Sequence, residues 1–434
     1  MAKHQHRRGG RVTPKGTRGG LRLSEQERLG LEDIFERFLS GAAEIATATT
    51  ALEVEAWAST LWNVFQRQQL VGADAVKVMG GGLITYAGRD GSTASLIVLR
   101  ALASVAPEPY RTKAERAADR LVAAGAPEPT WSALPGAQRP TKAVMQFDPV
   151  DDDGITVMVG FDGPGGPDTV GVYIDFNLGH MVKDVFIVPT PVDDVRDLLV
   201  TEAVAEGTEF RELALSEAAA WWSAALTATD MTLDPPVDDD VYRLRPLIDA
   251  RLSTLPPRGE IAESKELNDT DRDELLDEFV ASPEAAHLIQ DGADPELIGE
   301  LAFHILNFSL GYVYGQRLRF SPVMVEIFCC SWAPRKALLD DEGLDVLPDV
   351  LRSWIEFVGH RRGIPDAAVD GALEAVERYE PTLRAESGDE TNWGPAKLLA
   401  RSLQAEGIDI TDSKAVQSFI DRVNAAGGMD TLLR

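Results

Sequence analysis

The first third of the chain repeats apolar residues at intervals of three and four, which is typical of helices with one buried face. A capping box, Ser-Glu-Gln-Glu, begins at Ser24 and predicts the start of a helix. The apolar positions that follow have helical spacing: Leu29, Ile34, Phe35 and Phe38. Similar patterns continue to about residue 125, as in "TKAERAADRLVAAG". The sequence therefore predicts a helical domain at residues 23–136.

The period of the pattern changes in the next region. Residues 125–141, "GAPEPTWSALPGAQRPT", are dense in proline and glycine, which break helices and strands. Apolar residues then alternate with polar or small ones, which predicts strands. Two such runs stand out: Ile155, Val157, Val159 and Phe161, then Val170, Val172, Ile174 and Phe176. Short turns, "DGPGGPD" and "NLG", connect the strands, so we expect an antiparallel β meander at residues 137–191.

Helical patterns return after Pro191, and no further strand is predicted there. Ser282, Asp294 and Ser321 each precede a proline, an arrangement typical of helix starts. We expect a helical domain at residues 192–386, which could pack with the meander as one unit, and a C-terminal helical segment at 387–434. The predicted fold class is α+β and predominantly α-helical, with a helical N-terminal domain, a small antiparallel meander and a large helical C-terminal region.

Charge is distributed unevenly along the chain. The formal net charge is −28, yet the first 22 residues contain seven cations and no acid: Lys3, Arg7, Arg8, Arg11, Lys15, Arg18 and Arg22. Subtracting these seven positive charges leaves −35 on the rest of the chain. Such a body repels nucleic acid and anionic membranes, so only this tail, which is expected to be disordered alone, could contact a phosphate backbone. The tail could equally contact the acidic body or only aid solubility.

Apolar runs and cysteine content predict the cellular compartment of the protein. The sequence has no uninterrupted apolar run of about 18 residues and no signal peptide, which favours the cytoplasm. Its only cysteines, Cys329 and Cys330, are neighbours in an apolar helical stretch. A disulfide framework is therefore excluded, and small buried side chains are the expected role of both residues.

The segment "TVGVYIDFNLGHMVKDVFIV" concentrates reactive side chains in the meander. Asp162, Asp175 and Asp184, with His180, are candidate catalytic residues of a metal-dependent hydrolase or nuclease, because carboxylates on adjacent strands can hold Mg²⁺. In the alternative interpretation they belong to an ordinary hairpin whose polar side chains face water. Asp184 does not fit simple alternation, so either a bulge intervenes or an acid lies beside the core.

Other motifs support no specific chemistry. Glu300 and His304 are four residues apart on a predicted helix and could supply half of a metal site, but no second pair accompanies them. The Gly-rich stretch at residues 77–95 lacks the P-loop and dinucleotide fingerprints, and a Gly-X-Ser-X-Gly nucleophile elbow is absent. We therefore expect no cofactor and no metal.

Two regions carry a resemblance to a known group. The tail segment "GGRVTPKGTRG" and "SPVMVEIFCCSWAPRKALL" with the following "LPDVLRSWIEFVGHRRGIP" resemble uncharacterised, mostly helical acidic proteins of high-GC Gram-positive bacteria. The resemblance covers the tail and roughly residues 280–385. It implies a bacterial cytoplasmic origin and supplies no catalytic residue.

The sequence thus favours a non-enzymatic interaction or regulatory protein of the bacterial cytoplasm. Its helical surfaces would bind a protein partner, and its basic tail could contact nucleic acid; no membrane contact is expected. The alternative is the metal-dependent hydrolase or nuclease that uses the acids of the meander. A third class, small-molecule binding between helical regions, stays open.

Overall fold

The computed structural model describes seven segments of the chain: residues 25–67, 75–177, 179–203, 208–261, 267–312, 318–409 and 412–425. The chain divides into two compact units: residues 1–137 with 243–250, and residues 138–242 with 251–434. Ser24 and the seven tail cations lie outside the described residues. The predicted cap and the predicted role of the tail therefore stay predictions.

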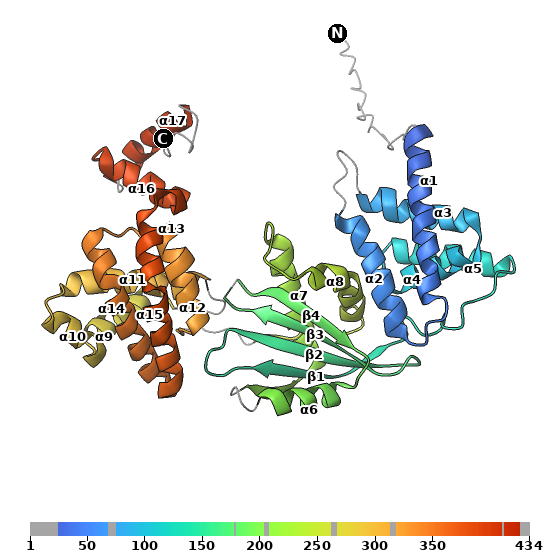
Figure 1. Ribbon diagram of the computed structural model, residues 1–434, viewed down its shortest axis with the longest axis horizontal. Coiled ribbons are helices and arrows are strands. Elements are labelled where there is room, and N and C mark those ends of the chain that lie inside the picture. Colours follow the sequence, from blue (N-terminus) through green and yellow to red (C-terminus); the bar gives the residue numbers. More distant parts are fainter. Residues whose placement is uncertain are drawn as a thin grey trace, which may run out of the picture. The chain divides into compact units, whose positions relative to one another are not determined.

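In the described residues of the first unit, every regular element is a helix or a helical turn (Figure 1). Its elements are α1 (Glu25–Ser40), a 3₁₀ turn (Gly41–Ile45), α2 (Ala51–Arg67), a π-helical turn (Val76–Gly80), α3 (Gly81–Asp90), α4 (Thr93–Val105) and α5 (Tyr110–Ala123). Gly91 ends α3 with a φ of 70°, and the Ser92 hydroxyl caps α4 by accepting from the amide of Ser95. Residues 243–250 of α8 (Asp239–Leu252) complete this unit.

The second unit contains an antiparallel sheet of five strands among its described residues. These are β1 (Arg139–Phe147), β2 (Gly154–Asp162), β3 (Asp168–Asp175), β4 (Met181–Val188) and β5 (Glu209–Leu213), in the order β4-β3-β2-β1-β5. The predicted meander is confirmed for the first four strands, since each pairs with its neighbour in sequence.

Strand β5 corrects the prediction that no strand follows Pro191. It follows α6 (Val192–Ala203) and precedes α7 (Leu215–Met231) in the chain. In the sheet it is an edge strand that pairs with β1. Three of its five residues are charged and exposed, as is common for edge strands, and its apolar Phe210 and Leu213 are three apart. Alternation of apolar residues therefore gave no signal.

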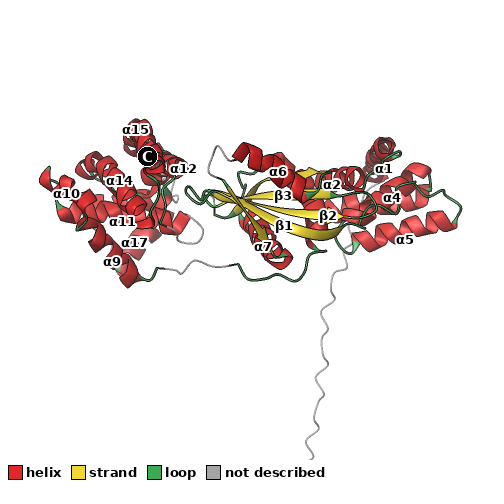
Figure 2. Ribbon diagram, turned by 90° about the horizontal axis from the view of Figure 1, so that it is seen from below, coloured by secondary structure: helices red, strands yellow, loops and turns green. Residues whose placement is uncertain are grey.

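Helices α6 and α7 cover opposite faces of the sheet (Figures 1 and 2). On the α6 face, Val144 and Met158 pack with Val192 and Val195. On the other face, the indole of Trp222 donates to the carbonyl of Val157 at 3.0 Å. The sheet is therefore buried on both sides.

The C-terminal part of the second unit is a set of helices, and those from α9 to α15 share one apolar core. The elements are α9 (Asp269–Val280), α10 (Pro283–Gln290), α11 (Pro295–Tyr312), α12 (Pro322–Ile327), a π-helical turn (Phe328–Trp332), α13 (Ala333–Lys336), α14 (Asp341–Arg362), α15 (Asp366–Gly388), a 3₁₀ turn (Glu390–Asn392), α16 (Pro395–Ala405) and α17 (Ser413–Ala425). Trp354 is fully buried, and its ring contacts Phe279 edge to face at 5.0 Å. Ser282 and Ser321 cap α10 and α12 as predicted. The fold class, α+β and mainly helical, is confirmed.

Candidate functional site

The three candidate acids of the meander do not meet. Asp162 lies opposite Arg139 at one end of β2, whereas Asp175 pairs with Gly154 at the other end. Eight residues of extended strand separate these ends by roughly 26 Å. In the part of the chain that the structure describes, no group of three or more histidines, cysteines and acids could hold a metal ion. The two carboxylates cannot share one cation.

A β-bulge explains why Asp184 breaks the alternation. Tyr173 pairs with Asp184 and Ile174 pairs with Val182, so Lys183 is an extra residue in β4. The bulge leaves both Lys183 and Asp184 exposed, and buried residues resume on either side of them. Asp184 accepts a hydrogen bond from the next amide in the chain, at 2.6 Å. The acid therefore lies outside the core and faces water.

Asp175 has a local structural role. One of its carboxylate oxygens accepts from the amide of Asn177 at 2.8 Å, which shapes the turn after β3, and the other lies 3.3 Å from the ammonium of Lys183. The residue is 4% exposed. These contacts fix the turn and leave no opening for a substrate.

A buried hydrogen-bond network, which was not predicted from the sequence, lies at the same end of the sheet as Asp175. The guanidinium of Arg319, 1% exposed, donates to Asp153 Oδ1 and to Asn177 Oδ1, each at 2.7 Å. Ser321 donates to the same oxygen of Asp153 at 2.6 Å, and Arg319 also donates to the carbonyl of Asp151 at 2.8 Å. The network ties the segment before α12 to the loops that flank β2 and β3.

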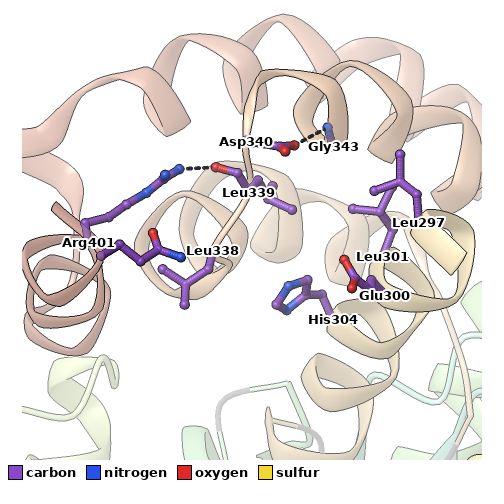
Figure 3. A pocket seen from close by; sticks show the side chains of 10 residues that line it. Leu297, Glu300, Leu301, His304, Leu338, Leu339, Asp340, Gly343 and Arg401 are labelled. Atoms are coloured by element: carbon purple, nitrogen blue, oxygen red, sulfur yellow. Dashed lines mark hydrogen bonds between the residues drawn. The ribbon is translucent and has the colours of Figure 1, made fainter. Parts of the chain in front are cut away.

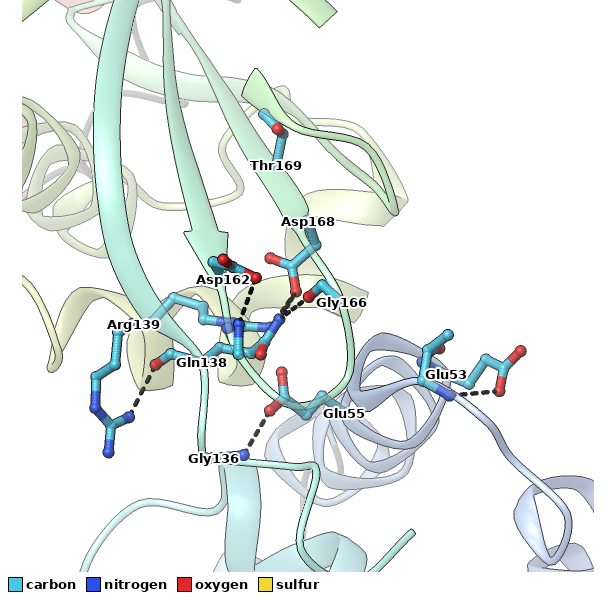
Figure 4. A network of polar contacts seen from close by, with 12 residues as sticks. Glu53, Glu55, Gly136, Gln138, Arg139, Asp162, Gly166, Asp168 and Thr169 are labelled. Carbon is cyan, nitrogen blue, oxygen red and sulfur yellow. Dashed lines mark hydrogen bonds and ion pairs between the residues drawn. The ribbon is translucent and has the colours of Figure 1, made fainter. Parts of the chain in front are cut away.

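A second buried arginine closes the opposite end of the same strands. Arg251 donates to Asp168 Oδ2 at 2.8 Å, and the amide of Gln138 donates to that oxygen and to the carbonyl of Gly166, also at 2.8 Å (Figure 4). The Arg251 guanidinium also lies 4.8 Å from the ring centroid of Phe161. Burial raises the pKa of Asp168 above its usual 3.8, although Arg251 and Gln138 act to lower it. Because both charged groups are nearly inaccessible, this pair stabilises the sheet end rather than meeting a substrate.

His180 is part of an aromatic cluster. Its ring packs edge to face against Phe176 and Trp221, with centroids 5.4 and 5.1 Å away, and the residue is 3% exposed. Its φ of 65° is a left-handed conformation that non-glycine residues rarely adopt. Burial lowers the pKa of His180 from 6.5 to about 4. A histidine held neutral in this way packs like an aromatic residue near neutral pH.

Acidification is expected to destabilise the fold through His180. The folded state holds this ring neutral between pH 6.5 and about 4, while the unfolded chain binds a proton there, so stability is lost as the pH falls through that window. The loss amounts to roughly 3 kcal/mol by pH 4. His180→Phe, which keeps an aromatic ring and cannot titrate, is expected to remove that part of the pH dependence. Urea unfolding at pH 7 and pH 4 measures it, and equal pH dependence in both proteins would contradict this assignment.

The cysteines have the properties expected of buried small residues. Both are free; Cys329 is buried and Cys330 partly so. Burial raises the pKa of Cys329 from 9.0 to about 12 and also raises that of Cys330. Neither thiol is activated as a nucleophile.

An open groove lies between α9 and α11. It encloses about 540 Å³ and has an apolar floor with an acidic rim. The partly buried Leu276, Val280 and Gly299 form the floor, and the exposed Ala281 and Pro295 also line the groove. Asp273, Asp277 and Glu296 form the rim and are exposed. We call this feature the α9–α11 groove.

The rim carries charge that the described part of the chain does not neutralise. None of Asp273, Asp277 and Glu296 forms an ion pair with another described residue. Asp273 and Asp277 are four apart on one helix, where like charges destabilise by about 0.2–0.5 kcal/mol. Cations from outside would offset this repulsion.

Glu300 and His304 line a separate, smaller pocket of about 170 Å³ (Figure 3). The imidazole is hydrogen-bonded to the backbone of Leu338, and burial lowers its pKa. No third acid, histidine or cysteine of the described residues completes a metal site with them. The sequence interpretation singled out this pair, but it could not supply the residues opposite, which come from α16.

Among the described helices, none combines the length and the apolar character that crossing a bilayer requires.

Comparisons with protein-family models, with curated proteins and with solved structures gave no match. The resemblance to helical proteins of high-GC Gram-positive bacteria therefore stays a prediction. Only the geometry of this chain bears on its function.

Proposed function

We propose that the protein is a non-enzymatic interaction protein that binds a basic, amphipathic helix of a partner protein in the α9–α11 groove. The observation that carries this proposal is the combination of an apolar floor with three exposed carboxylates at its rim that form no ion pair with another described residue. A helix that lies in a groove presents apolar side chains at positions i, i+3, i+4 and i+7 to such a floor.

The floor supports a partner that contributes apolar side chains. Leu276 and Val280 are one turn apart on α9, and both pack on the core from the outside while staying partly exposed. Gly299 faces Val280 from α11, and a Cβ at Gly299 would lie 3.8 Å from a methyl group of Val280. The absence of a side chain at Gly299 thus helps to keep the groove open.

The rim supports a partner with positive charge. The chain's net charge of −28 raises the encounter rate with cationic partners and slows approach of nucleic acid or anionic lipid. Lysines or arginines beside the apolar positions of the bound helix would lie near Asp273, Asp277 and Glu296. The groove therefore favours a basic protein segment over a phosphate backbone.

The enzymatic alternative has less support, because two of the acids it requires, Asp162 and Asp175, lie at opposite ends of the sheet. Contact of the basic tail with nucleic acid stays a prediction from composition.

A synthetic amphipathic peptide of leucine and lysine, about 18 residues or five helical turns long, tests the groove. We expect the labelled peptide to bind the full chain in fluorescence anisotropy, more weakly as salt rises. Gly299→Leu fills the groove without changing its charge and is expected to weaken binding at least about tenfold, a loss of 1.4 kcal/mol. Gly299→Ala, which meets only ordinary contact with Val280, is the matched control and is expected to bind as the wild type does.

A charge control separates the rim from general attraction. Asp273→Asn, Asp277→Asn and Glu296→Gln together are expected to weaken binding, whereas Asp370→Asn, Glu374→Gln and Glu377→Gln on α15 remove the same charge from another exposed face and are expected to have little effect. Equal effects of the two triple variants, or unchanged binding by Gly299→Leu, would contradict the proposal.

A further inference from the structure

The pocket that contains Glu300 and His304 has walls from four parts of the C-terminal helical region (Figure 3). One wall is formed by residues of α11, the second by the segment just before α14, the third by the first turn of α14, and the fourth by residues of α16. Ten residues line it: Leu297, Glu300, Leu301, His304, Leu338, Leu339, Asp340, Gly343, Arg401 and Gln404. Its volume of about 170 Å³ is below the ~300–1,000 Å³ of sites for drug-sized ligands, so it fits a smaller molecule.

One side of the pocket is cationic. The guanidinium of Arg401 is held in place by a hydrogen bond to the carbonyl of Leu339 and lies 5.8 Å from the ring centroid of Trp393. No carboxylate of the described residues pairs with Arg401, and its buried Nε has no hydrogen-bond partner among them. A planar guanidinium with free N–H groups is suited to bind a carboxylate.

The other side of the pocket is anionic. Glu300 projects from α11, across the pocket from Arg401, and forms no ion pair with a described residue (Figure 3). His304 lies one turn further along α11, and its lowered pKa leaves it neutral at pH 7. Asp340 has one oxygen engaged in capping α14 through the amide of Gly343. Both acids are anionic, but Glu300 is the one whose carboxylate has no hydrogen bond or ion pair with a described residue.

Leucine side chains provide the apolar part of the lining: Leu297, Leu301, Leu338 and Leu339. A ligand that satisfies all three parts needs a carboxylate, a cation and a small apolar group. A dicarboxylate would meet repulsion from Glu300 and Asp340, and a simple amine would leave Arg401 without an anion. The lining therefore selects a zwitterion.

We propose that this pocket binds a free apolar α-amino acid of about the size of leucine, with its carboxylate on Arg401, its ammonium on Glu300 and its side chain among the four leucines. The proposal does not depend on the α9–α11 groove, because the two sites share no lining residue. Binding here would make the protein responsive to a metabolite.

Calorimetric titration of the full chain with L-leucine tests the assignment. We expect L-leucine to bind, and isocaproate, which lacks the ammonium, and isoamylamine, which lacks the carboxylate, to bind at least about tenfold more weakly, as the loss of one charged hydrogen bond predicts. L-glutamate is expected not to bind, since its second carboxylate would enter the leucine-lined part. Equal binding of isocaproate, isoamylamine and L-leucine would overturn the zwitterion, and no binding of L-leucine to the folded wild type would overturn the site.

Two variants test which residue binds each charged group of the ligand. Arg401→Gln is expected to abolish the preference for L-leucine over isoamylamine, and Glu300→Gln to abolish the preference over isocaproate. Arg422→Gln removes an exposed arginine that pairs with Glu406 on the same unit and serves as the matched control, with unchanged binding. Thermal melting confirms that each variant is folded. If Arg401→Gln is not, Arg401→Lys replaces it and is expected to bind L-leucine more weakly, because lysine keeps the charge but lacks the planar guanidinium. Unchanged selectivity in the folded variants would overturn the assigned roles.

Discussion

Replacing Arg319 with methionine is expected to lower the free energy of unfolding of the sheet by about 3 kcal/mol. The side chain is 1% exposed and holds Asp153 and Asn177 at once, at 2.7 Å each. Removing it leaves the Asp153 carboxylate without its countercharge and the Asn177 carbonyl without its donor, and such groups cost far more when one partner is lost than when both are replaced. Hydrogen–deuterium exchange of the β2 and β3 amides measures the change.

Two further variants make this result specific. Arg319→Lys keeps the charge but cannot bridge both acceptors, so it is expected to recover only part of the loss. Arg196→Met, the matched control, breaks ion pairs with Asp193 and Asp197 on an exposed helix, where pairs are worth at most about 1 kcal/mol. If Arg319→Met cost no more than Arg196→Met, the network would not hold this end of the sheet.

Arg251→Met is expected to cost about 3 kcal/mol at neutral pH, with a deficit that shrinks on acidification. The folded state already raises the pKa of Asp168 above 3.8, so it binds a proton more readily than the unfolded chain does. The stability linked to this group is greatest below pH 3.8 and is lost as the pH rises through the folded pKa. Without Arg251, which acts to lower that pKa, the shift widens and the loss at neutral pH grows.

The same exchange measurement between pH 4 and pH 8 tests this pair. Adding Asp168→Asn to Arg251→Met removes the buried charge altogether, and we expect it to restore much of the stability and to cancel the extra pH dependence. A deficit in Arg251→Met that is the same at every pH would show that lost packing on Phe161, rather than the charge of Asp168, causes the effect.

Local patterns in the sequence were sufficient for the meander and for the caps of several helices. Alternation placed β2 and β3, and a serine before a proline placed the starts of α10 and α12. These signals depend on residues a few positions apart, so a single sequence contains them. Asp184 shows how far such local patterns reach. The alternation indicated that this strand was irregular at Asp184, but only the pairing of β3 with β4 identified the bulge at Lys183.

Contacts between distant residues could not be predicted in this way. Arg319 lies 166 positions from Asp153, and Arg251 lies 83 from Asp168, so neither arginine carries a local sign of burial. Likewise, the i,i+4 spacing of Glu300 and His304 was visible, but their pocket exists only because α16 brings Arg401 opposite them. The candidate acids of the meander show the converse, since closeness in sequence did not bring Asp162 and Asp175 together.

The charge composition of the sequence also could not predict the shape of the acidic surfaces. The acidic composition indicated a body that repels phosphate, but it did not distinguish one acidic face from another. The α9–α11 groove differs from the acidic face of α15 because Leu276 and Val280 stay partly exposed beside Asp273 and Asp277. That combination depends on the packing of α9 against α11, which no local sequence pattern predicts.

Methyl NMR of the full chain during titration with the leucine–lysine peptide tests the interaction proposal most directly. We expect the methyl signals of Leu276 and Val280 to shift with the peptide, and to stay still in Gly299→Leu, while the buried methyl groups of the sheet do not respond. Peptide binding that shifts methyl groups elsewhere and leaves those of Leu276 and Val280 unchanged would contradict the proposal that the α9–α11 groove is the binding site.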